Sequence, residues 1–334
     1  MKDYFGVSMR MAYCSICGCD REVITITSVD KVYNLIKCMN CGLVFLNPEP
    51  PIGELEKIYL EERDFYFLRQ NFYSVTRQLK YKIASWRFSG FGLKKTPLDI
   101  SKRFIAWLIE KTSGHCTPYT MAVPLLMPKK AAILEIGYGN GAWLLGMKAL
   151  GFSNLYGIDI NEVAKEKLTE AKIQVRTGDI LSVDFPAEYF DLIRLEFVLE
   201  HLSSPNERLS KIAQWLKSSG KIVMSLPNIE SLTYDFFREF TVALQLPEHI
   251  YHYSYHTITM LADRCGLKVI EYRTMPAWNQ FAASLQKYLG NINKANFFTN
   301  LMNRKLICII IQPIYSFLVS KNKGDFMSLV MGKK

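Results

Sequence analysis

The 334-residue sequence lacks the long apolar segments that direct proteins into or across membranes. Its N-terminus, MKDYFGVSMRMAYC, contains no apolar run of about 7–15 residues, which excludes a recognisable secretory signal. The longest apolar stretch, Leu306–Val319, contains Gln312 and Pro313 and is shorter than the roughly 20 residues of a membrane span. With 49% hydrophobic and 22% charged residues, the composition is that of a globular protein. We therefore expect a folded, soluble, cytoplasmic protein.

Acidic residues are scarce towards the C-terminus. Residues 277–334 contain eight Lys or Arg and one acid, Asp325, so they contribute +7 to a net charge of +10. This excess favours an anionic partner: a phosphorylated small molecule, a nucleic acid or an anionic membrane surface. Solvated surface lysines are the alternative. Pro313 argues against one straight helix in this part of the chain.

Four cysteines stand in two closely spaced pairs. They are Cys14-Ser-Ile-Cys17 and, after 20 residues, Cys38-Met-Asn-Cys41, a spacing that strongly predicts a zinc site. The residues between the pairs alternate apolar and polar side chains in two runs, as in a β-hairpin. Four cysteine ligands leave no open coordination position, so the zinc would be structural. Cys19 is a further candidate ligand, but it fits the paired spacing less well.

From Ile52 to Ser113 the sequence has helical spacing and many aromatic side chains. Ten basic residues and two acids lie between Arg63 and Arg103. Aromatic and basic residues in alternation can bind nucleic acid or lipid headgroups. Helices that pack one face on the next domain are the other interpretation. We expect this part to be a helical linker.

A buried strand over 132–136 runs into a glycine-rich turn, Gly137-Tyr-Gly139-Asn-Gly141, and then into a helix. Such a turn lets a ligand approach the backbone at the start of the helix. The spacing also fits a dinucleotide fingerprint. Glu135, two residues before the first glycine, would repel a pyrophosphate but suits a cationic amino-acid group.

Further acids follow the predicted strands. Asp159 ends the second strand, Asp179 follows the third and Glu196 ends the fourth. Ligands of open α/β sheets bind at these carboxyl ends. We therefore expect the three acids to meet the glycine turn at one edge of a sheet.

Taken in order, these motifs resemble the class I S-adenosylmethionine-dependent methyltransferases, with the E-x-G-x-G-x-G turn and a "VLEHL" segment ending at Leu202. The cysteine pairs, followed by Gly-Leu-Val-Phe-Leu-Asn-Pro48, resemble the zinc ribbon of a bacterial subgroup that methylates small molecules and sugars. The resemblance implies a Rossmann-like seven-stranded sheet with an antiparallel last strand. It implies a zinc ribbon over 12–50, the linker over 51–128, and a methyltransferase domain over 129–334 with an insertion at about 277–324. The cofactor-binding residues that it implies are Glu135, Gly137, Gly139, Gly141, Asp159, Ile160, Asp179, Ile180 and Glu196.

Methyl transfer to a hydroxyl or carbon acid also needs a general base. We rank His249 first, because the resemblance places a substrate-facing histidine there, followed by His201 and Glu196. A metal site built from His249, His252 and His256 is disfavoured, because no cysteine or spaced aspartate joins it.

The leading expectation is methylation of a small molecule, most plausibly a sugar or sugar nucleotide in a bacterial glycan or natural-product pathway. The alternatives are RNA methylation, a nicotinamide-dependent oxidoreductase, and a non-catalytic zinc-stabilised binding protein. One observation argues against RNA methylation. The fourth strand ends in Leu-Glu-Phe-Val and lacks the Asn/Asp-Pro-Pro-Tyr motif that is used for methylation of exocyclic base amines. The basic insertion could be a peripheral membrane element over 281–320, a substrate lid or a dimer face.

Overall fold

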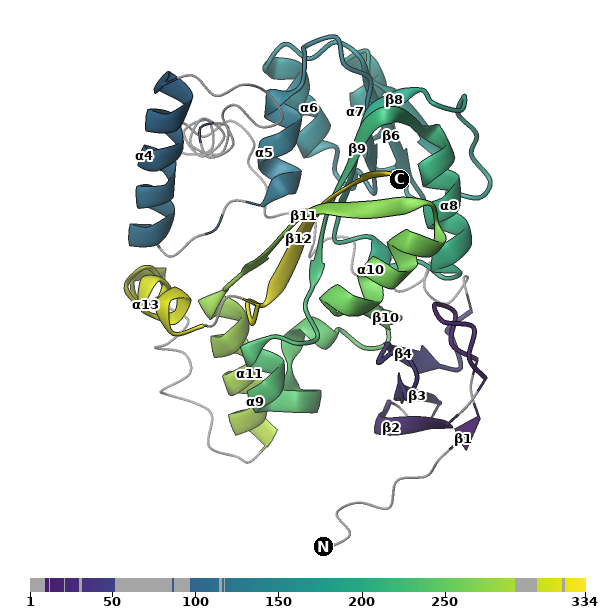
Figure 1. The fold of residues 1–334 in the computed structure, drawn as a ribbon, viewed down its shortest axis with the longest axis vertical. Coiled ribbons are helices and arrows are strands. Elements are labelled where there is room, and N and C mark those ends of the chain that lie inside the picture. Colours follow the sequence, from purple (N-terminus) through teal and green to yellow (C-terminus); the bar gives the residue numbers. More distant parts are fainter. Residues whose placement is uncertain are drawn as a thin grey trace, which may run out of the picture.

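The computed structural model describes residues 10–11, 13–20, 22–29, 32–51, 86, 97–113, 116, 118–291, 305–319 and 322–334. Its larger sheet has seven strands in the order β11-β12-β9-β8-β5-β6-β7 (Figure 1). β5 to β9 run parallel to one another, whereas β12 pairs antiparallel with both β9 and β11. The predicted Rossmann-like sheet with an antiparallel last strand is confirmed. The strands are β5 Ile133–Ile136, β6 Leu155–Asp159, β7 Gln174–Thr177, β8 Phe190–Glu196, β9 Leu216–Pro227, β11 Leu267–Met275 and β12 Phe326–Lys333.

The central strands are short apolar runs buried on both faces, as expected of a parallel sheet covered by helices. All four residues of β5 are buried, and β8 is buried except at Asp191 and Glu196. Two clusters of buried side chains, one containing Leu134 and Ile193 and the other Ile133 and Leu192, form the main core. The helices that pack on strands of this sheet are α5 Tyr119–Leu126, α6 Ala142–Ala149, α7 Lys165–Glu170, α8 Pro205–Trp215 and α10 Tyr255–Arg264, whereas α9 Leu232–Phe237 packs on α11 Trp278–Asn291.

The N-terminal residues form the predicted hairpin and extend it into a second sheet. Its strands are β1 Arg10–Met11, β2 Glu22–Val29, β3 Tyr33–Cys38 and β4 Val44–Asn47, joined by the two-residue β10 Tyr251–His252. β10 pairs antiparallel with β4, with Tyr251 opposite Phe45 and His252 opposite Val44. The N-terminal sheet therefore includes a segment from the second half of the chain, which the sequence did not predict.

The basic C-terminal part forms two described helices, α11 Trp278–Asn291 and α13 Lys305–Leu318. This part of the chain is not a single helix, but Pro313 is not the reason, because it lies inside α13 and does not end it. Gln312 holds α13 to the start of α11, because its amide accepts from Trp278 N–H at 2.8 Å and donates to Pro276 O at 2.9 Å.

The predicted helical linker is described in part. α4 covers Pro97–Ser113, while residues 52–85 and 87–96 lie outside the described residues. Within the described part of the chain, no helix combines the length and the apolar character needed to cross a membrane.

Candidate active site

Three glycines form the turn between β5 and α6, and all have positive φ angles: Gly137 73°, Gly139 52° and Gly141 70°. A Cβ atom at Gly137 would lie 2.5 Å from Val198, and one at Gly141 would lie 2.9 Å from Leu168. Nothing lies within 4 Å of the same position at Gly139. The first and third glycines are therefore needed for packing, whereas the second leaves open space beside the backbone.

Glu135 on β5 is buried beside Arg194 on β8. The two are register partners on neighbouring strands, and Arg194 Nη1 donates to Glu135 Oε1. Arg194 also lies 3.3 Å from Glu196 Oε2, donates to Thr120 O at 3.0 Å and covers the ring of Trp143. Burial raises the pKa of Glu135 to about 7, although Arg194 acts to lower it. The second carboxylate oxygen of Glu135 is buried without a hydrogen-bond partner, so it can accept from a cationic ligand group.

Asp159 ties the end of β6 to the glycine turn. Its Oδ2 accepts from Gly139 N–H at 2.7 Å, and its Oδ1 accepts from Asn161 N–H at 2.9 Å. Burial raises the pKa of Asp159, and these backbone donors act to lower it. The next residue, Ile160, remains exposed. The carboxylate therefore fixes the shape of the turn as well as facing the space beside it.

Asp179, after β7, is held by a cation that the sequence did not reveal. Arg208 of α8 donates to Asp179 Oδ2 from Nε at 3.1 Å and from Nη2 at 2.8 Å. Leu181 N–H donates to the other carboxylate oxygen at 2.8 Å. Arg208 itself is buried, and Ile180 is buried beside Asp179. The negative charge at this position is thus already compensated.

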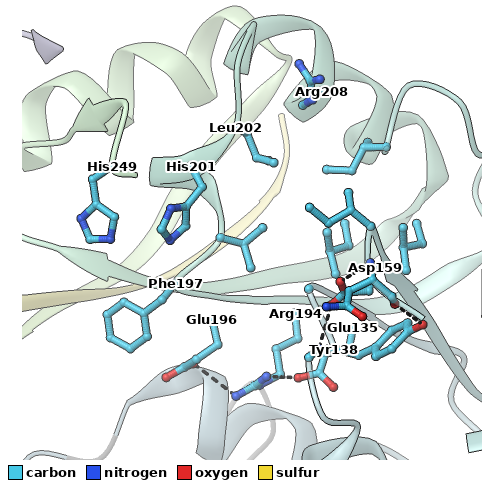
Figure 2. Close-up of a pocket in the computed structure, with 18 of the residues that line it drawn as sticks. Glu135, Tyr138, Asp159, Arg194, Glu196, Phe197, His201, Leu202, Arg208 and His249 are labelled. Carbon is cyan, nitrogen blue, oxygen red and sulfur yellow. Dashed lines mark hydrogen bonds and ion pairs between the residues drawn. The ribbon is translucent and has the colours of Figure 1, made fainter. Parts of the chain in front are cut away.

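These residues line one cavity of about 630 Å³ at the carboxyl ends of the parallel strands. Figure 2 shows Glu135, Tyr138 and Asp159 towards one end, and Phe197, His201 and His249 towards the other. Gly141 packs beneath the turn and is the one predicted cofactor residue that does not line the cavity. The predicted residues that line it are Glu135, Gly137, Gly139, Asp159, Ile160, Asp179, Ile180, Glu196, His201 and His249; Trp143, Arg194, Arg208, Gln245, Gln280 and Phe326 were not predicted.

His201 and His249 lie together, with ring centres 4.5 Å apart. Nδ1 of His201 lies 3.1 Å from Glu248 O, and Nδ1 of His249 lies 2.9 Å from Ala243 O. Because a carbonyl only accepts, each Nδ1 is assigned the ring hydrogen. Burial lowers the pKa of His201 to about 4 and that of His249 well below its ordinary value. His249 is therefore neutral at physiological pH, and its Nε2 is the nitrogen that can accept a proton.

Glu200 is a buried acid beside this histidine pair. Neither of its carboxylate oxygens has a hydrogen-bond partner, and burial raises its pKa to about 8. Glu200, His201 and His249 each offer one ligand atom within 4.8 Å of the others. Two imidazoles and a carboxylate form a donor set for a divalent metal. His252 and His256, which the sequence offered as further metal ligands beside His249, do not belong to this group, and His256 is exposed on α10.

The four predicted cysteine ligands converge in the ribbon. Cys14 Sγ lies 3.6 Å from Cys41 Sγ, and Cys17 Sγ lies 3.7 Å from Cys38 Sγ. All four sulfurs lie within 4.8 Å of one another, whereas Cys19 is not part of the cluster. Tetrahedral Zn–S bonds of about 2.3 Å require sulfurs about 3.8 Å apart. The cluster therefore has the donors and the size of a zinc site with four cysteine ligands.

Part of the chain is similar in sequence to known methyltransferases. Residues 109–272 match a family model described as a methyltransferase domain. The chain is 27% identical over 194 residues to phosphoethanolamine N-methyltransferase from Plasmodium falciparum, covering 54% of this chain and 70% of that protein. It is 29% identical over 107 residues to human EEF1A lysine methyltransferase 2, covering 29% of this chain and 44% of that relative.

Among solved structures, a SAM-dependent methyltransferase from Thermotoga maritima, described as a possible histamine N-methyltransferase, aligns over 75% of this chain and 100% of its own. The TM-score is 0.43 and the sequence identity 14%. The family match covers the glycine turn, the acids at the strand ends and the seven-stranded sheet as far as β11. Residues 109–272 therefore form a methyltransferase domain, and its Rossmann-like sheet and glycine turn are those expected of the S-adenosylmethionine-dependent class.

Proposed function

We propose that the enzyme methylates a small hydroxylated acceptor, such as the sugar part of a sugar nucleotide. The observation that carries this proposal is the polarity of the cavity. The end around Asp159 is rich in acids, whereas the end around His249 presents neutral imidazole and amide groups and one acid, Glu196, whose charge is compensated by Arg194 3.3 Å away (Figure 2). An uncharged acceptor that forms many hydrogen bonds matches the second end.

At the first end, the open side of Gly139 and the unpartnered oxygen of Glu135 fit the amino-acid part of the cofactor. Asp159 and Ile160 would lie along its ribose, and Asp179 and Ile180 at its adenine. When bound, S-adenosylmethionine supplies a sulfonium methyl group that is already activated for in-line displacement. The protein then has to align the acceptor and remove its proton.

We call the end of the cavity around His249 the acceptor end. The cations available in the cavity limit which acceptors can bind there. The cationic side chains lining the cavity, Arg194 and Arg208, are both paired with acids. A phosphate inside would therefore lack a cation of its own. Gln280, whose Oε1 is buried without a partner, offers an amide to a hydroxyl group. We infer that the sugar-like part enters and that any phosphate stays outside. The Plasmodium relative, by its name, methylates a phosphorylated amine.

His249→Asn is expected to lower kcat by about 100-fold, because general-base catalysis contributes about 10²–10⁴. Protonation of His249 would block the reaction, and its pKa lies well below 6.5, so the acid limb of the wild-type pH profile should lie below that pH. The variant should lose this limb and keep its cofactor affinity. His256→Asn changes an exposed histidine and is the matched control. An unchanged profile in His249→Asn would remove His249 from the mechanism.

The proposed function is tested in two steps. Calorimetric titration should show binding of S-adenosylhomocysteine and none of NAD⁺. Labelled methyl transfer is then measured to nucleotide sugars, phosphoethanolamine, RNA and a lysine-containing protein. Transfer to the sugars supports the proposal. Transfer to one of the other acceptors alone refutes the sugar assignment, and failure to bind S-adenosylhomocysteine refutes the site.

We further propose that the ribbon binds one structural zinc ion through Cys14, Cys17, Cys38 and Cys41. Cys38→Ser is expected to remove the metal and lower the unfolding temperature, because metal binding stabilises the folded ribbon. Cys19→Ser is the control and should keep the ion. Elemental analysis of purified protein and thermal unfolding measure both effects. Metal-free wild type, or zinc retained by Cys38→Ser, would contradict the ligand set.

A further inference from the structure

Helix α13 turns a wholly apolar face to solvent. Ile310, Ile314, Phe317 and Leu318 recur at positions i, i+4, i+7 and i+8, and they are 55–89% exposed. This spacing places them on one side of the helix. The opposite side is anchored, since Gln312, Tyr315 and Val319 are buried. The exposed residues are therefore the outer face of a docked helix.

Helix α4, which contacts α13, repeats this pattern. Ile100, Phe104, Trp107 and Leu108 follow the same spacing and are 41–59% exposed. Both helices lie on the side of the molecule away from the ribbon (Figure 1). We call these eight residues the α4–α13 face. Exposed apolar side chains gathered on two helices that contact each other are typical of an interaction surface.

The charge of the sequence around α13 indicates which kind of partner binds this face. Residues 274–324 contain six Lys or Arg and no acid; in the sequence, Arg304 and Lys305 stand at one end of α13, and Lys321 follows the other. Lys323, two residues further on, is paired with Asp235 at 2.7 Å. Basic residues flanking an apolar helix face, together with an exposed Trp, match a membrane interface with anionic lipids. A 14-residue helix is about 21 Å long, so α13 would lie in the plane of the interface and not across it.

We propose that the α4–α13 face binds the surface of an anionic lipid membrane. The face is also connected to the cavity: α11 packs against α13 and carries Gln280, which lines the acceptor end. Docking on this side would hold that end of the enzyme near the membrane surface. The inference concerns location and does not depend on which acceptor is methylated.

The test is co-sedimentation of the full chain with vesicles of phosphatidylglycerol and phosphatidylcholine, or of phosphatidylcholine alone. We expect binding to the anionic vesicles, weakened at about 0.5 M salt. Ile314→Glu should lower the partition coefficient at least tenfold. Val32→Glu is the matched control, because Val32 in the ribbon is 58% exposed against 55% for Ile314, and it should bind like wild type. Equal unfolding temperatures for the three proteins exclude misfolding as the cause.

A second copy of the chain is the competing partner for this face. Sedimentation velocity without lipid distinguishes the two: a dimer that Ile314→Glu dissociates, in a protein that does not bind the vesicles, would overturn the proposal. Absence of vesicle binding by a monomer would overturn it as well. Equal loss of binding in Ile314→Glu and Val32→Glu would show a general charge effect and would also refute the face.

Discussion

Replacing Arg194 with methionine is expected to lower the free energy of unfolding by about 3–5 kcal/mol, because removing one partner of a buried ion pair leaves the other charge uncompensated. Glu135 is 3% exposed, and Arg194 is the cation that contacts it in the described structure. Chemical denaturation measures the loss. Lys217→Met breaks the ion pair with Asp191, which is partly exposed, and should cost less than about 1 kcal/mol.

The loss of unfolding free energy in Arg194→Met should depend on pH. The folded-state pKa of Glu135 is already raised from 4.5 to about 7 and would rise further without Arg194. The folded state then binds a proton more tightly than the unfolded state, so stability decreases as pH increases between these two pKa values. The variant should therefore be less destabilised at pH 5 than at pH 8. Adding Glu135→Gln should recover stability at pH 8; a double variant no more stable than the single one would disprove the coupling.

Gly139→Arg is expected to weaken binding of S-adenosylhomocysteine at least 100-fold, about 2.7 kcal/mol. A Cβ atom at this position meets no atom within 4 Å, so a longer side chain would project beside the cavity that Gly139 lines. The chain should still fold, since the change costs only the strain of a positive φ angle, about 1–3 kcal/mol. Calorimetric titration and thermal unfolding measure the two effects.

Gly266→Arg is the matched control for this substitution. Gly266 has a φ angle of 71°, and nothing lies within 4 Å of its Cβ position, but it lies in the turn before β11 and not at the cavity. Both variants should lose similar stability, and only Gly139→Arg should lose affinity. Unchanged affinity in Gly139→Arg would show that the cofactor does not occupy the space beside the turn.

The strands and the glycine turn were predictable because their signals are local. An apolar run such as Ile-Leu-Glu-Ile followed by spaced glycines determines a strand, a turn and a helix within about 15 residues. The acids Asp159 and Asp179 could be assigned to one edge because parallel strands bring their carboxyl ends together. The cysteine cluster was predictable for the same reason, because the spacing within each cysteine pair is a local signal.

The partners of these residues were not predictable, because they come from distant parts of the chain. Glu135 and Arg194 are 59 residues apart, and only the register of β5 and β8 makes them neighbours. An arginine inside the apolar strand Leu-Ile-Arg-Leu was the available signal, since a buried cation requires a partner. β10 has two residues, too few for any periodic pattern, so its pairing with β4 left no trace in the sequence.

The position of β12 determines the order in which the large sheet can be completed during synthesis. This strand lies between β9 and β11, yet it is translated after every other strand of the sheet. Until it arrives, the facing edges of β9 and β11 have no partner between them, and unpaired strand edges are sites of aggregation. Slow or interrupted translation before residue 326 should therefore produce an incomplete sheet that depends on chaperones, even when the glycine turn and its strands have already formed.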